Sequence, residues 1–412
     1  MNDRIKAPRG AIKASVKLPS SKSISNRALI LNALSNSSFG VANLSDCDDT
    51  NLMVNALRSE GCDFNVGAAG TTMRFLTAFL AQREGQWTIT GSARMKNRPI
   101  KVLVEALNAL GAHIEYIEKE GFPPLRIAGC PLRGGEISLP GDISSQYISA
   151  LLMIAPFMRQ GVTLHLVGEI VSRPYIHITL QLMRQFGVQS TWADHTIKVG
   201  PQRYQPVRFT VESDWSAASY WYQIMALSPS AEIELLGLFE QSLQGDAAGA
   251  KLFSQLGVET LFTERGVRLR HNGKRCQRLD YDFVNEPDLA QTFVVTCALL
   301  NVPFRFTGLQ SLKIKETDRI EALKREMKKL GYVLHDENGD TLVWDGEQCD
   351  ARLLPIDTYD DHRMAMAFAP AAFRFPGLVI NNPQVVTKSY PQYWEHLRLA
   401  GFKVEEVGVQ EA

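Results

Sequence analysis

Apolar residues recur with helical spacing in six segments of the chain, and each segment opens with small or polar residues. The first segment reads SKSISNRALILNAL and the last reads DDHRMAMAFAPAAF. Apolar positions three and four residues apart share one face of a helix, so the pattern predicts six helices. The segments begin at residues 21, 70, 143, 214, 287 and 360, so their starts are 71 to 73 residues apart after a first step of 49. Such a period indicates one structural unit used repeatedly.

A second series of segments lies between the first six. Each is a helical stretch that stops at Gly and continues into an apolar, strand-like run, as in MKKLGYVL. Gly directly after a helix is typical of a left-handed C-terminal residue. The glycines concerned are Gly61, Gly111, Gly187, Gly257, Gly331 and Gly401. Each repeat is therefore predicted to contain two helices separated and followed by strands.

The repeats divide into two halves. Three repeats precede the loop GPQRYQPVRF at 200–209 and three follow it, which predicts two equivalent α/β domains. The first repeat is about 24 residues shorter than the others, and the loss between Leu57 and Gly70 suggests a trimmed hairpin. A (β/α)₈ barrel is the alternative, but its units of roughly 30 residues would give a shorter period.

The helix starts also predict a type of ligand. Ser, Thr and Asp at these positions are suited to cap the free backbone N–H groups, and a helix N-terminus carries a partial positive charge. Six such ends gathered on one side would bind anions.

Composition narrows the class of protein. The chain has 412 residues, of which 45% are hydrophobic, and its 44 basic residues balance 44 acidic ones. The balance argues against a nucleic-acid-binding surface. Six cysteines without CxxC or zinc spacing predict reduced, mostly buried thiols. The N-terminus MNDRIKAPRG has no apolar signal segment, and no apolar run could span a membrane. We expect a soluble, cytoplasmic protein without nucleic-acid or membrane partners.

Basic side chains cluster at two of the helix starts in the first half. LPSSKSISNRALI places Lys22 and Arg27 across a Ser-rich start, and RMKNRPI holds three basic residues within five positions. Backbone donors and side-chain cations could converge there on one anion. The polar start ISSQY also suits a phosphate. Each cluster alone is equally typical of a solvated surface.

Mixed charges cluster in the second half. KETDRI brings Lys315, Glu316 and Arg319 within one helical turn, and DDHR stands directly before an apolar helix. NEPDLA places Asp288 at a repeat position where an acid could also serve only as a helix cap. These clusters occupy equivalent points of the repeat, so the fold would gather them. No phosphate loop, dinucleotide fingerprint or HExxH motif is present. The sequence therefore predicts a cationic site with two candidate acids and no metal or cofactor.

Eight motifs carry a resemblance to a known family. In chain order, from Leu18 to about Leu397, they are LPSSKSISNRALI, AAGTTMRFLTA, RMKNRPI, SSQYISALLM, SRPYIHITL, PDLAQT, KETDRI and DDHRMAMAF. The chain resembles the enolpyruvyl transferases, and among them the enzymes that act on shikimate 3-phosphate. The resemblance implies a two-domain inside-out α/β barrel in which each domain has three βαβαββ repeats. The domains would span 21–213 and 1–20 with 214–412, with the active site in the interdomain cleft.

The resemblance also implies the reaction and its residues. The enolpyruvyl group of phosphoenolpyruvate would move to the 5-hydroxyl of shikimate 3-phosphate, without a cofactor, in an enzyme expected to be a monomer. The implied catalytic residues are Asp288, Glu316 and Lys22. The residues implied for shikimate 3-phosphate are Lys22, Ser23, Arg27, Ser144, Ser145, Gln146, Ser172, Tyr175, Asp288 and Lys315. The residues implied for phosphoenolpyruvate are Lys22, Gly70, Arg98, Gln146, Arg319, Arg363 and Lys388.

The chain departs from the usual motifs at a few positions. Ala68 stands where Asn is common, Phe75 where Pro is usual, Ser311 where Asn is common and Arg173 where Lys is usual. Two other functions stay open at this point. A UDP-N-acetylglucosamine enolpyruvyl transferase would share the fold, but its Lys-Asn start and loop cysteine have no match here. A non-catalytic binder of phosphorylated metabolites would gain nothing from two carboxylates beside its anions.

Overall fold

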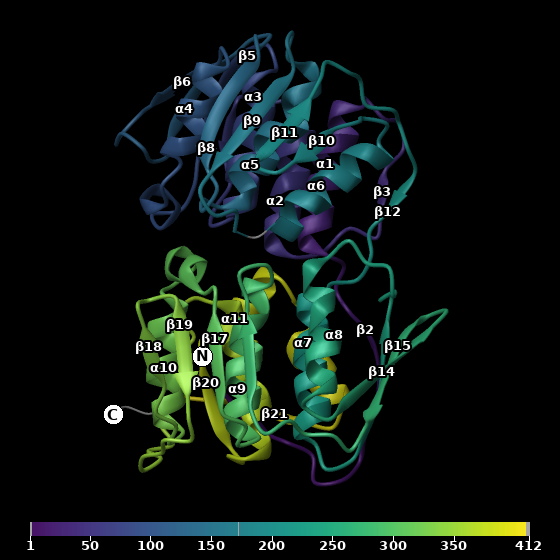
Figure 1. The fold of residues 1–412 in the computed structure, drawn as a ribbon, viewed down its shortest axis with the longest axis vertical. Coiled ribbons are helices and arrows are strands. Elements are labelled where there is room, and N and C mark those ends of the chain that lie inside the picture. Colours follow the sequence, from purple (N-terminus) through teal and green to yellow (C-terminus); the bar gives the residue numbers. More distant parts are fainter. Residues whose placement is uncertain (1, 172, 409–412) are drawn as a thin grey trace. The chain divides into compact units, whose positions relative to one another are not determined.

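The computed structural model describes residues 2–171 and 173–408, which form two compact units (Figure 1). The inserted unit is Ser20–Glu212, and the discontinuous unit combines Met1–Pro19 with Ser213–Ala412. The borders expected from the sequence, between residues 20 and 21 and between 213 and 214, are each one residue C-terminal to these. The two units are described separately below.

Two full repeats of the inserted unit have the same topology. In each, two parallel strands flank the first helix, and the second helix leads into an antiparallel pair, giving strand orders β4-β5-β7-β6 and β8-β9-β11-β10. The second repeat contains β4 (Asp63–Asn65), α3 (Gly70–Ala81), β5 (Gly85–Thr90), α4 (Lys101–Ala109), β6 (His113–Tyr116) and β7 (Leu125–Gly129). The third contains β8 (Gly135–Pro140), α5 (Ser145–Ile154), β9 (Val162–Val167), α6 (Arg173–Gln185), β10 (Thr191–Ala193) and β11 (Thr196–Val199).

The discontinuous unit repeats this βαβαββ topology, with strand orders β2-β13-β15-β14 and β16-β17-β19-β18. The fourth repeat contains β2 (Ile12–Lys17), α7 (Trp215–Leu227), β13 (Ala231–Leu236), α8 (Gly249–Ser254), β14 (Val258–Thr263) and β15 (Gly266–His271). The fifth contains β16 (Leu279–Asp282), the 3₁₀ turn η4 (Pro287–Leu289), α9 (Ala290–Leu299), β17 (Phe304–Thr307), α10 (Arg319–Lys329), β18 (His335–Glu337) and β19 (Thr341–Trp344).

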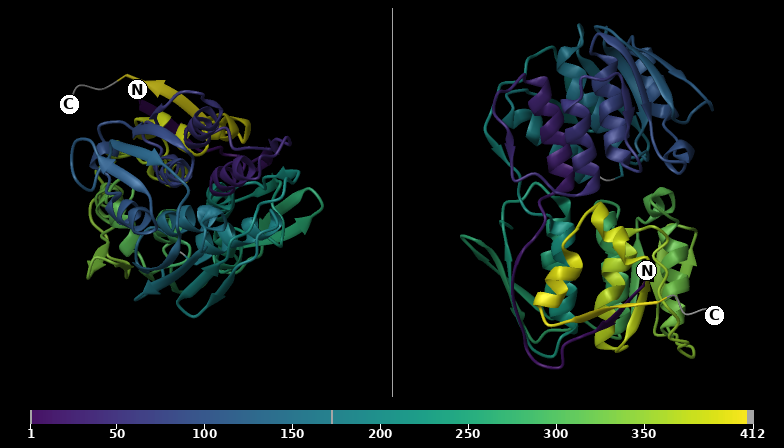
Figure 2. Two further views of the ribbon diagram at one scale, coloured as in Figure 1. Left: turned by 90° about the horizontal axis from the view of Figure 1, so that it is seen from above. Right: turned by 180° about the vertical axis from the view of Figure 1, so that it is seen from behind.

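The sixth repeat is closed by the N-terminal strand. Its members are α11 (His362–Phe368), β20 (Leu378–Asn381), α12 (Tyr393–Leu399), β21 (Lys403–Val407) and β1 (Asn2–Lys6). Strand β1 lies antiparallel to both β20 and β21, so the two ends of the described chain are side by side (Figure 2). A single parallel bridge between Ile356 and Ile380 replaces the first strand. The sixth repeat thus keeps the common strand order in reduced form.

The first repeat lacks its antiparallel strand pair. It contains β12 (Phe209–Thr210), α1 (Lys22–Leu34), β3 (Val41–Ala42) and α2 (Asp48–Arg58), and its sheet has only the parallel strands β12 and β3. After α2 the described chain turns directly into β4 of the next repeat. This confirms the trimmed hairpin that the short first step predicted.

The glycine signals hold where the hairpin is present. Gly111, Gly187, Gly257, Gly331 and Gly401 have φ between +88° and +105°, a region that glycine enters without steric cost. Gly61 is not among the glycines with positive φ, and α2 ends instead in the extended residue Ser59. The expected glycine ending is therefore wrong for α2, because the chain leaves this helix without the turn into a third strand.

The first helix of a repeat lies inside its unit and the sheets lie outside. Every residue of α3, α7, α9 and α11 is buried, whereas strands such as β9 alternate between buried and partly exposed positions. A helix that is apolar on all sides belongs in a core, and an alternating strand covers it with one face. In the discontinuous unit α7 contacts α9, which contacts α11 (Figure 1). This is the inside-out α/β arrangement that the resemblance to the family implies.

Two sequence expectations about single residues need correction. Side-chain caps occur at Ser144, Asp214 and Asp361, but α1, α3 and η4 have none, so the helix starts are not uniformly capped. The thiols are free, yet only Cys47 and Cys297 are buried.

Among the described residues, no helix is both long enough and apolar enough to span a membrane.

Candidate active site

Arg27 of α1 is a buried cation held by neutral oxygens. Its Nε donates to Thr179 Oγ1 at 2.7 Å, its Nη2 donates to Ser149 Oγ at 3.1 Å and its Nη1 donates to the carbonyl of Ser23 at 2.9 Å. Burial lowers the pKa of Arg27 to about 10, so the guanidinium stays charged at neutral pH. A buried charge without a carboxylate partner is stabilised when an anion binds beside it.

The Phe75 ring accounts for one departure from the family motifs. The guanidinium carbon of Arg27 lies 5.3 Å from the centre of this ring, a cation–π contact. Phe75 is itself fully buried on α3. The aromatic residue therefore gives the buried guanidinium a contact in addition to its polar partners.

Further predicted residues line the starts of helices in the inserted unit. Lys22 Nζ lies 3.6 Å from Asp49 Oδ2, and Asp49 is buried in the first turn of α2. Ser144 is the N-cap of α5 and accepts from the backbone N–H of Gln146, and Ser145 is buried in the first turn. Tyr175 is partly buried on α6 and interacts electrostatically with Arg27. Ser172, which the resemblance also implies, lies outside the described residues.

Gly70 leaves room for two arginines. A Cβ atom on Gly70 would lie 2.7 Å from Arg98 Nη1 and 2.8 Å from Arg74 Nη1. Arg74 also donates to Gln146 Oε1 at 2.6 Å, and Gln146 Nε2 donates to Thr71 Oγ1 at 3.0 Å. The start of α3 therefore has two guanidiniums beside it, and the Gln146 amide of α5 orients that of Arg74.

The discontinuous unit contains a connected network of ion pairs centred on Arg319. This guanidinium is almost completely buried at the start of α10. Its Nε lies 2.7 Å from Asp361 Oδ2, its Nη1 lies 3.1 Å from Asp288 Oδ1 and its Nη2 lies 2.9 Å from Glu316 Oε2. One planar side chain thus fixes three carboxylates from three segments of the chain.

The remaining predicted residues of this unit join the same network. Asp288 accepts from Arg363 Nη2 at 2.8 Å and lies 3.8 Å from Lys315 Nζ. Glu316 accepts from Lys388 Nζ at 2.6 Å. We call this set the ionic network; its members are Asp288, Lys315, Glu316, Arg319, Asp361, Arg363 and Lys388. Both candidate acids are thus ion-paired with the cations implied for phosphoenolpyruvate.

The network shifts the titration of its members. Burial alone would raise the pKa of the Asp288 carboxyl, but the three cations around it outweigh burial and hold that pKa well below its ordinary value. Burial lowers the pKa of Lys315, and the nearby Asp288 carboxylate offsets part of this. Burial would also lower the pKa of Arg319, yet the surrounding carboxylates raise it. At neutral pH Asp288 is therefore ionised and available as a proton acceptor.

Two residues near these sites were missed from the sequence, and Asp361 was noted in the DDHR cluster without a role. Asp361 holds Arg319, Arg74 binds Gln146, and Asp246 is buried beside the ionic network, where Ser216 donates a hydrogen bond to it. Burial, together with the charge of Asp288, raises the pKa of Asp246 to about 7. The repeat position of Asp361, directly before an apolar helix, was the one available signal. Nothing local distinguishes the other two.

Asp246 should make the stability of the protein pH-dependent. Its pKa is raised in the folded state, so its stabilising contribution is complete below about pH 4 and is lost as the pH rises towards 7. The difference in unfolding free energy between wild type and Asp246→Asn should fall by about 1.4 kcal/mol per pH unit at its steepest. Urea unfolding between pH 4.5 and 8 measures it. A difference that does not change with pH would contradict the shift.

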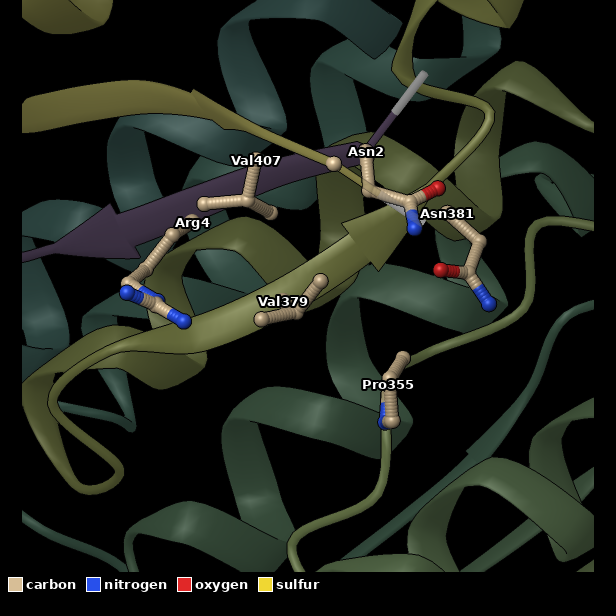
Figure 3. Close-up of a pocket in the computed structure, with 7 residues that line it drawn as sticks. Asn2, Arg4, Pro355, Val379, Asn381 and Val407 are labelled. Carbon is tan, nitrogen blue, oxygen red and sulfur yellow. The ribbon is translucent and has the colours of Figure 1, made fainter. Parts of the chain in front are cut away.

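A hollow in the discontinuous unit lies apart from the predicted site residues. It has a volume of about 440 Å³ and lies on the sheet of β1, β20 and β21, where Arg4 is its single charged residue (Figure 3). None of the predicted site residues lines it. Within the described part of the chain, no three side chains of His, Cys, Asp or Glu are grouped so as to hold a metal ion.

The predicted residues fall into two sets, one in each unit. Lys22, Arg27, Gly70, Arg98 and the α5 start belong to the inserted unit, and the ionic network belongs to the discontinuous unit. Ser311 is partly buried, and the structure shows no contact that explains its departure from the motif.

Comparison with known proteins shows which family this chain resembles. The family described as EPSP synthase (3-phosphoshikimate 1-carboxyvinyltransferase) matches residues 6–65 and 59–397. A protein of Bacteroides fragilis (strain YCH46), described as 3-phosphoshikimate 1-carboxyvinyltransferase, is 64% identical over 396 residues, covering 96% of this chain and 97% of that protein. A protein of the same description from Photobacterium damsela subsp. piscicida is 36% identical over 419 residues, covering 95% and 97%.

The comparisons also place the trimmed hairpin in context. The two family matches meet at 59–65, directly after α2. The Photobacterium alignment is longer than the 412 residues of this chain, so it contains positions that have no counterpart here, whereas the Bacteroides alignment is shorter. A solved EPSP synthase from Acinetobacter baumannii has a TM-score of 0.80 at 20% identity, covering 98% of this chain and all of that one, and so shares the fold. The chain belongs to the EPSP synthase (3-phosphoshikimate 1-carboxyvinyltransferase) family.

Proposed function

We propose that the protein transfers the enolpyruvyl group of phosphoenolpyruvate to the 5-hydroxyl of shikimate 3-phosphate and releases phosphate. The observation that carries this proposal is the ionic network, in which Asp288 and Glu316 share the guanidinium of Arg319. A site for anionic substrates alone would need cations. Two partly buried carboxylates among those cations are instead suited to moving protons during a reaction.

Shikimate 3-phosphate fits the polar set of the inserted unit. Arg27 has a buried charge and neutral partners, and Ser144 and Ser145 stand at the start of α5, where a phosphate is stabilised by backbone N–H groups. Ser23, Gln146, Ser172 and Tyr175 complete the residues proposed for this substrate. Lys22 is proposed to contact both substrates. Asp288 and Lys315 would address the hydroxyl groups.

Phosphoenolpyruvate would bind to cations that carboxylates now hold. The proposed residues are Lys22, Gly70, Arg98, Gln146, Arg319, Arg363 and Lys388. When the phosphate and carboxylate of the substrate engage Arg363 and Lys388, these cations interact less with Asp288 and Glu316. The pKa of a carboxyl rises when its cationic partner is shared with another anion. Substrate binding would therefore raise the proton affinity of both acids.

The proposed reaction proceeds by addition and elimination. Glu316 donates a proton to the methylene carbon of phosphoenolpyruvate, the 5-hydroxyl oxygen bonds to the adjacent carbon, and Asp288 takes the hydroxyl proton. The resulting methyl group then returns a proton to Glu316, the C–O bond to phosphate breaks and the double bond forms again, and the proton held by Asp288 leaves with the phosphate. Arg and Lys stabilise the charges throughout. Each proton transfer by a placed side chain contributes about 10²- to 10⁴-fold to the rate.

A phosphate-release assay tests the proposal. The purified protein should release phosphate when both substrates are present, and neither substrate alone should give release. UDP-N-acetylglucosamine in place of shikimate 3-phosphate serves as the control for the related transferase. Release with UDP-N-acetylglucosamine, or tight binding of shikimate 3-phosphate without any turnover, would replace the proposal by one of the two alternatives.

Gly70→Ala should selectively weaken the binding of phosphoenolpyruvate. The new methyl group would lie within 3 Å of the Arg98 and Arg74 guanidiniums, so both must move. Displacing a charged hydrogen bond costs about 1.5–3 kcal/mol, which corresponds to a KM increase of at least about tenfold. Steady-state kinetics with each substrate varied measure the effect. Gly40→Ala is the matched control, because nothing lies within 4 Å of a Cβ at that position. Equal KM values in both variants would remove Gly70 from the phosphoenolpyruvate site.

A further inference from the structure

The turn that precedes α11 has an unfavourable backbone conformation. Tyr359 and Asp360 have φ of +53° and +55°, two consecutive non-glycine residues in the left-handed region. Residues other than glycine rarely adopt this backbone conformation, because their Cβ approaches the following carbonyl oxygen. Such a conformation persists only where surrounding contacts enforce it, and it is concentrated at functional sites.

Buried Glu326 of α10 provides these contacts. The Tyr359 hydroxyl donates to Glu326 Oε1 at 2.6 Å, and the backbone N–H of Asp357 donates to Glu326 Oε2 at 3.0 Å. Lys329 Nζ lies 2.7 Å from the same carboxylate, which balances its charge. Burial and the Glu326 carboxylate raise the pKa of Tyr359, so its hydroxyl remains a donor across the working pH range. Glu326 thus holds the chain at Asp357, directly before the turn, and at Tyr359 within it.

The turn ends at the residue that organises the ionic network. Asp361 N–H donates to the carbonyl of Thr358 at 2.8 Å, which closes the turn. The Asp361 carboxylate binds Arg319 through both oxygens, at 2.7 and 3.4 Å, and accepts from the backbone N–H of Arg363 at 2.9 Å. The conformation of residues 358–361 therefore sets the position of the Arg319 guanidinium and of the Arg363 backbone, from which the Arg363 side chain extends.

We propose that Tyr359 and Glu326 are positioning residues for Arg319 and Arg363, acting through the left-handed turn and Asp361. The inference rests on the proposed function, because it assigns both arginines to phosphoenolpyruvate. Neither Tyr359 nor Glu326 needs to touch a substrate. Their hydrogen bond prevents the turn from relaxing into an ordinary conformation, which would move Asp361 and with it both cations.

Tyr359→Phe tests the inference by removing one hydroxyl. We expect the KM for phosphoenolpyruvate to rise at least tenfold while the KM for shikimate 3-phosphate changes less than twofold. Tyr222→Phe is the matched control, since its hydroxyl bonds Thr260 Oγ1 at 2.9 Å in the same unit and has no contact with the turn. The control should lower the melting temperature by a similar amount and leave both KM values unchanged.

Two further variants separate positioning from stability. Glycine adopts positive φ without steric cost. Adding Asp360→Gly to Tyr359→Phe should therefore lower the raised KM for phosphoenolpyruvate at least threefold. Glu326→Gln weakens the same hydrogen bond from its other partner, so its effect should not add to that of Tyr359→Phe. An unchanged phosphoenolpyruvate KM in Tyr359→Phe, or an equal rise for both substrates, would overturn the inference.

Failure of the proposed function would be visible separately. If wild type releases no phosphate with both substrates, the reaction assignment is wrong, and a crystal structure of Tyr359→Phe then decides the positioning role. Displacement of the Arg319 guanidinium from Asp361 in this variant, but not in Tyr222→Phe, supports it. An unmoved guanidinium refutes it.

Discussion

Asp288→Asn should lower kcat by at least about 10²-fold. The amide cannot accept a proton at neutral pH, and this position supplies the base in the proposed reaction. The same change releases Arg319, Arg363 and Lys315 from their shared carboxylate. The affinity for phosphoenolpyruvate should therefore stay the same or increase, so that the loss appears in kcat rather than in KM.

Glu316→Gln should likewise lower kcat, because this position supplies the proton donor in the proposed reaction. Glu321→Gln is the matched control. Glu321 lies five positions further along the chain and pairs with Lys324 at the partly exposed side of α10. The control should retain the wild-type kcat. Near-normal turnover in Asp288→Asn or in Glu316→Gln, measured by phosphate release, would remove that residue from proton transfer.

Arg319→Gln should destabilise the protein by about 3–5 kcal/mol, the usual result of removing one partner from a buried ion pair. Three carboxylates would lose their common cation, and Asp361 is fully buried. The deficit should shrink as the pH falls, because protonation of one carboxyl relieves the unpaired charge. Urea unfolding at pH 7.5 and pH 5 measures both effects.

Arg325→Gln is the control for this prediction, because Arg325 is exposed on the same helix. Its effect should remain within about 0.5 kcal/mol at both pH values. An Arg319→Gln deficit that is equal at the two pH values would show that the carboxylates do not carry the penalty. A deficit below about 1 kcal/mol would show that the ionic network contributes little to stability.

The same carboxylates serve both stability and chemistry. Without substrate they neutralise the cations, which reduces the repulsion among four neighbouring basic side chains, of which Arg319 and Arg363 are buried. In the proposed reaction the substrate takes over part of this role, so the acids change their proton affinity when it binds. The trimmed hairpin does not affect these contacts, because it is absent from the first repeat while every helix start is retained.

The sequence by itself determined the features that depend on nearby residues. Apolar spacing located the first helix of all six repeats, and the short first step located the missing hairpin. Both signals arise from contacts within a few turns of the chain, where spacing along the sequence corresponds to position in space. The motifs likewise named Asp288, Arg319 and Arg363, although nothing in the motifs showed that these three side chains bind one another.

Only the tertiary structure decided which distant residues meet. Strand β1 completes the sixth sheet and β2 the fourth, pairings between segments more than 200 positions apart. Asp246, Asp361 and Glu326 look like ordinary surface acids or helix caps in the sequence, yet folding buries all three. Their roles depend on partners supplied by other helices. A carboxylate acquires its function from its cations and its burial, and these are fixed by the packing of the repeats rather than by local sequence.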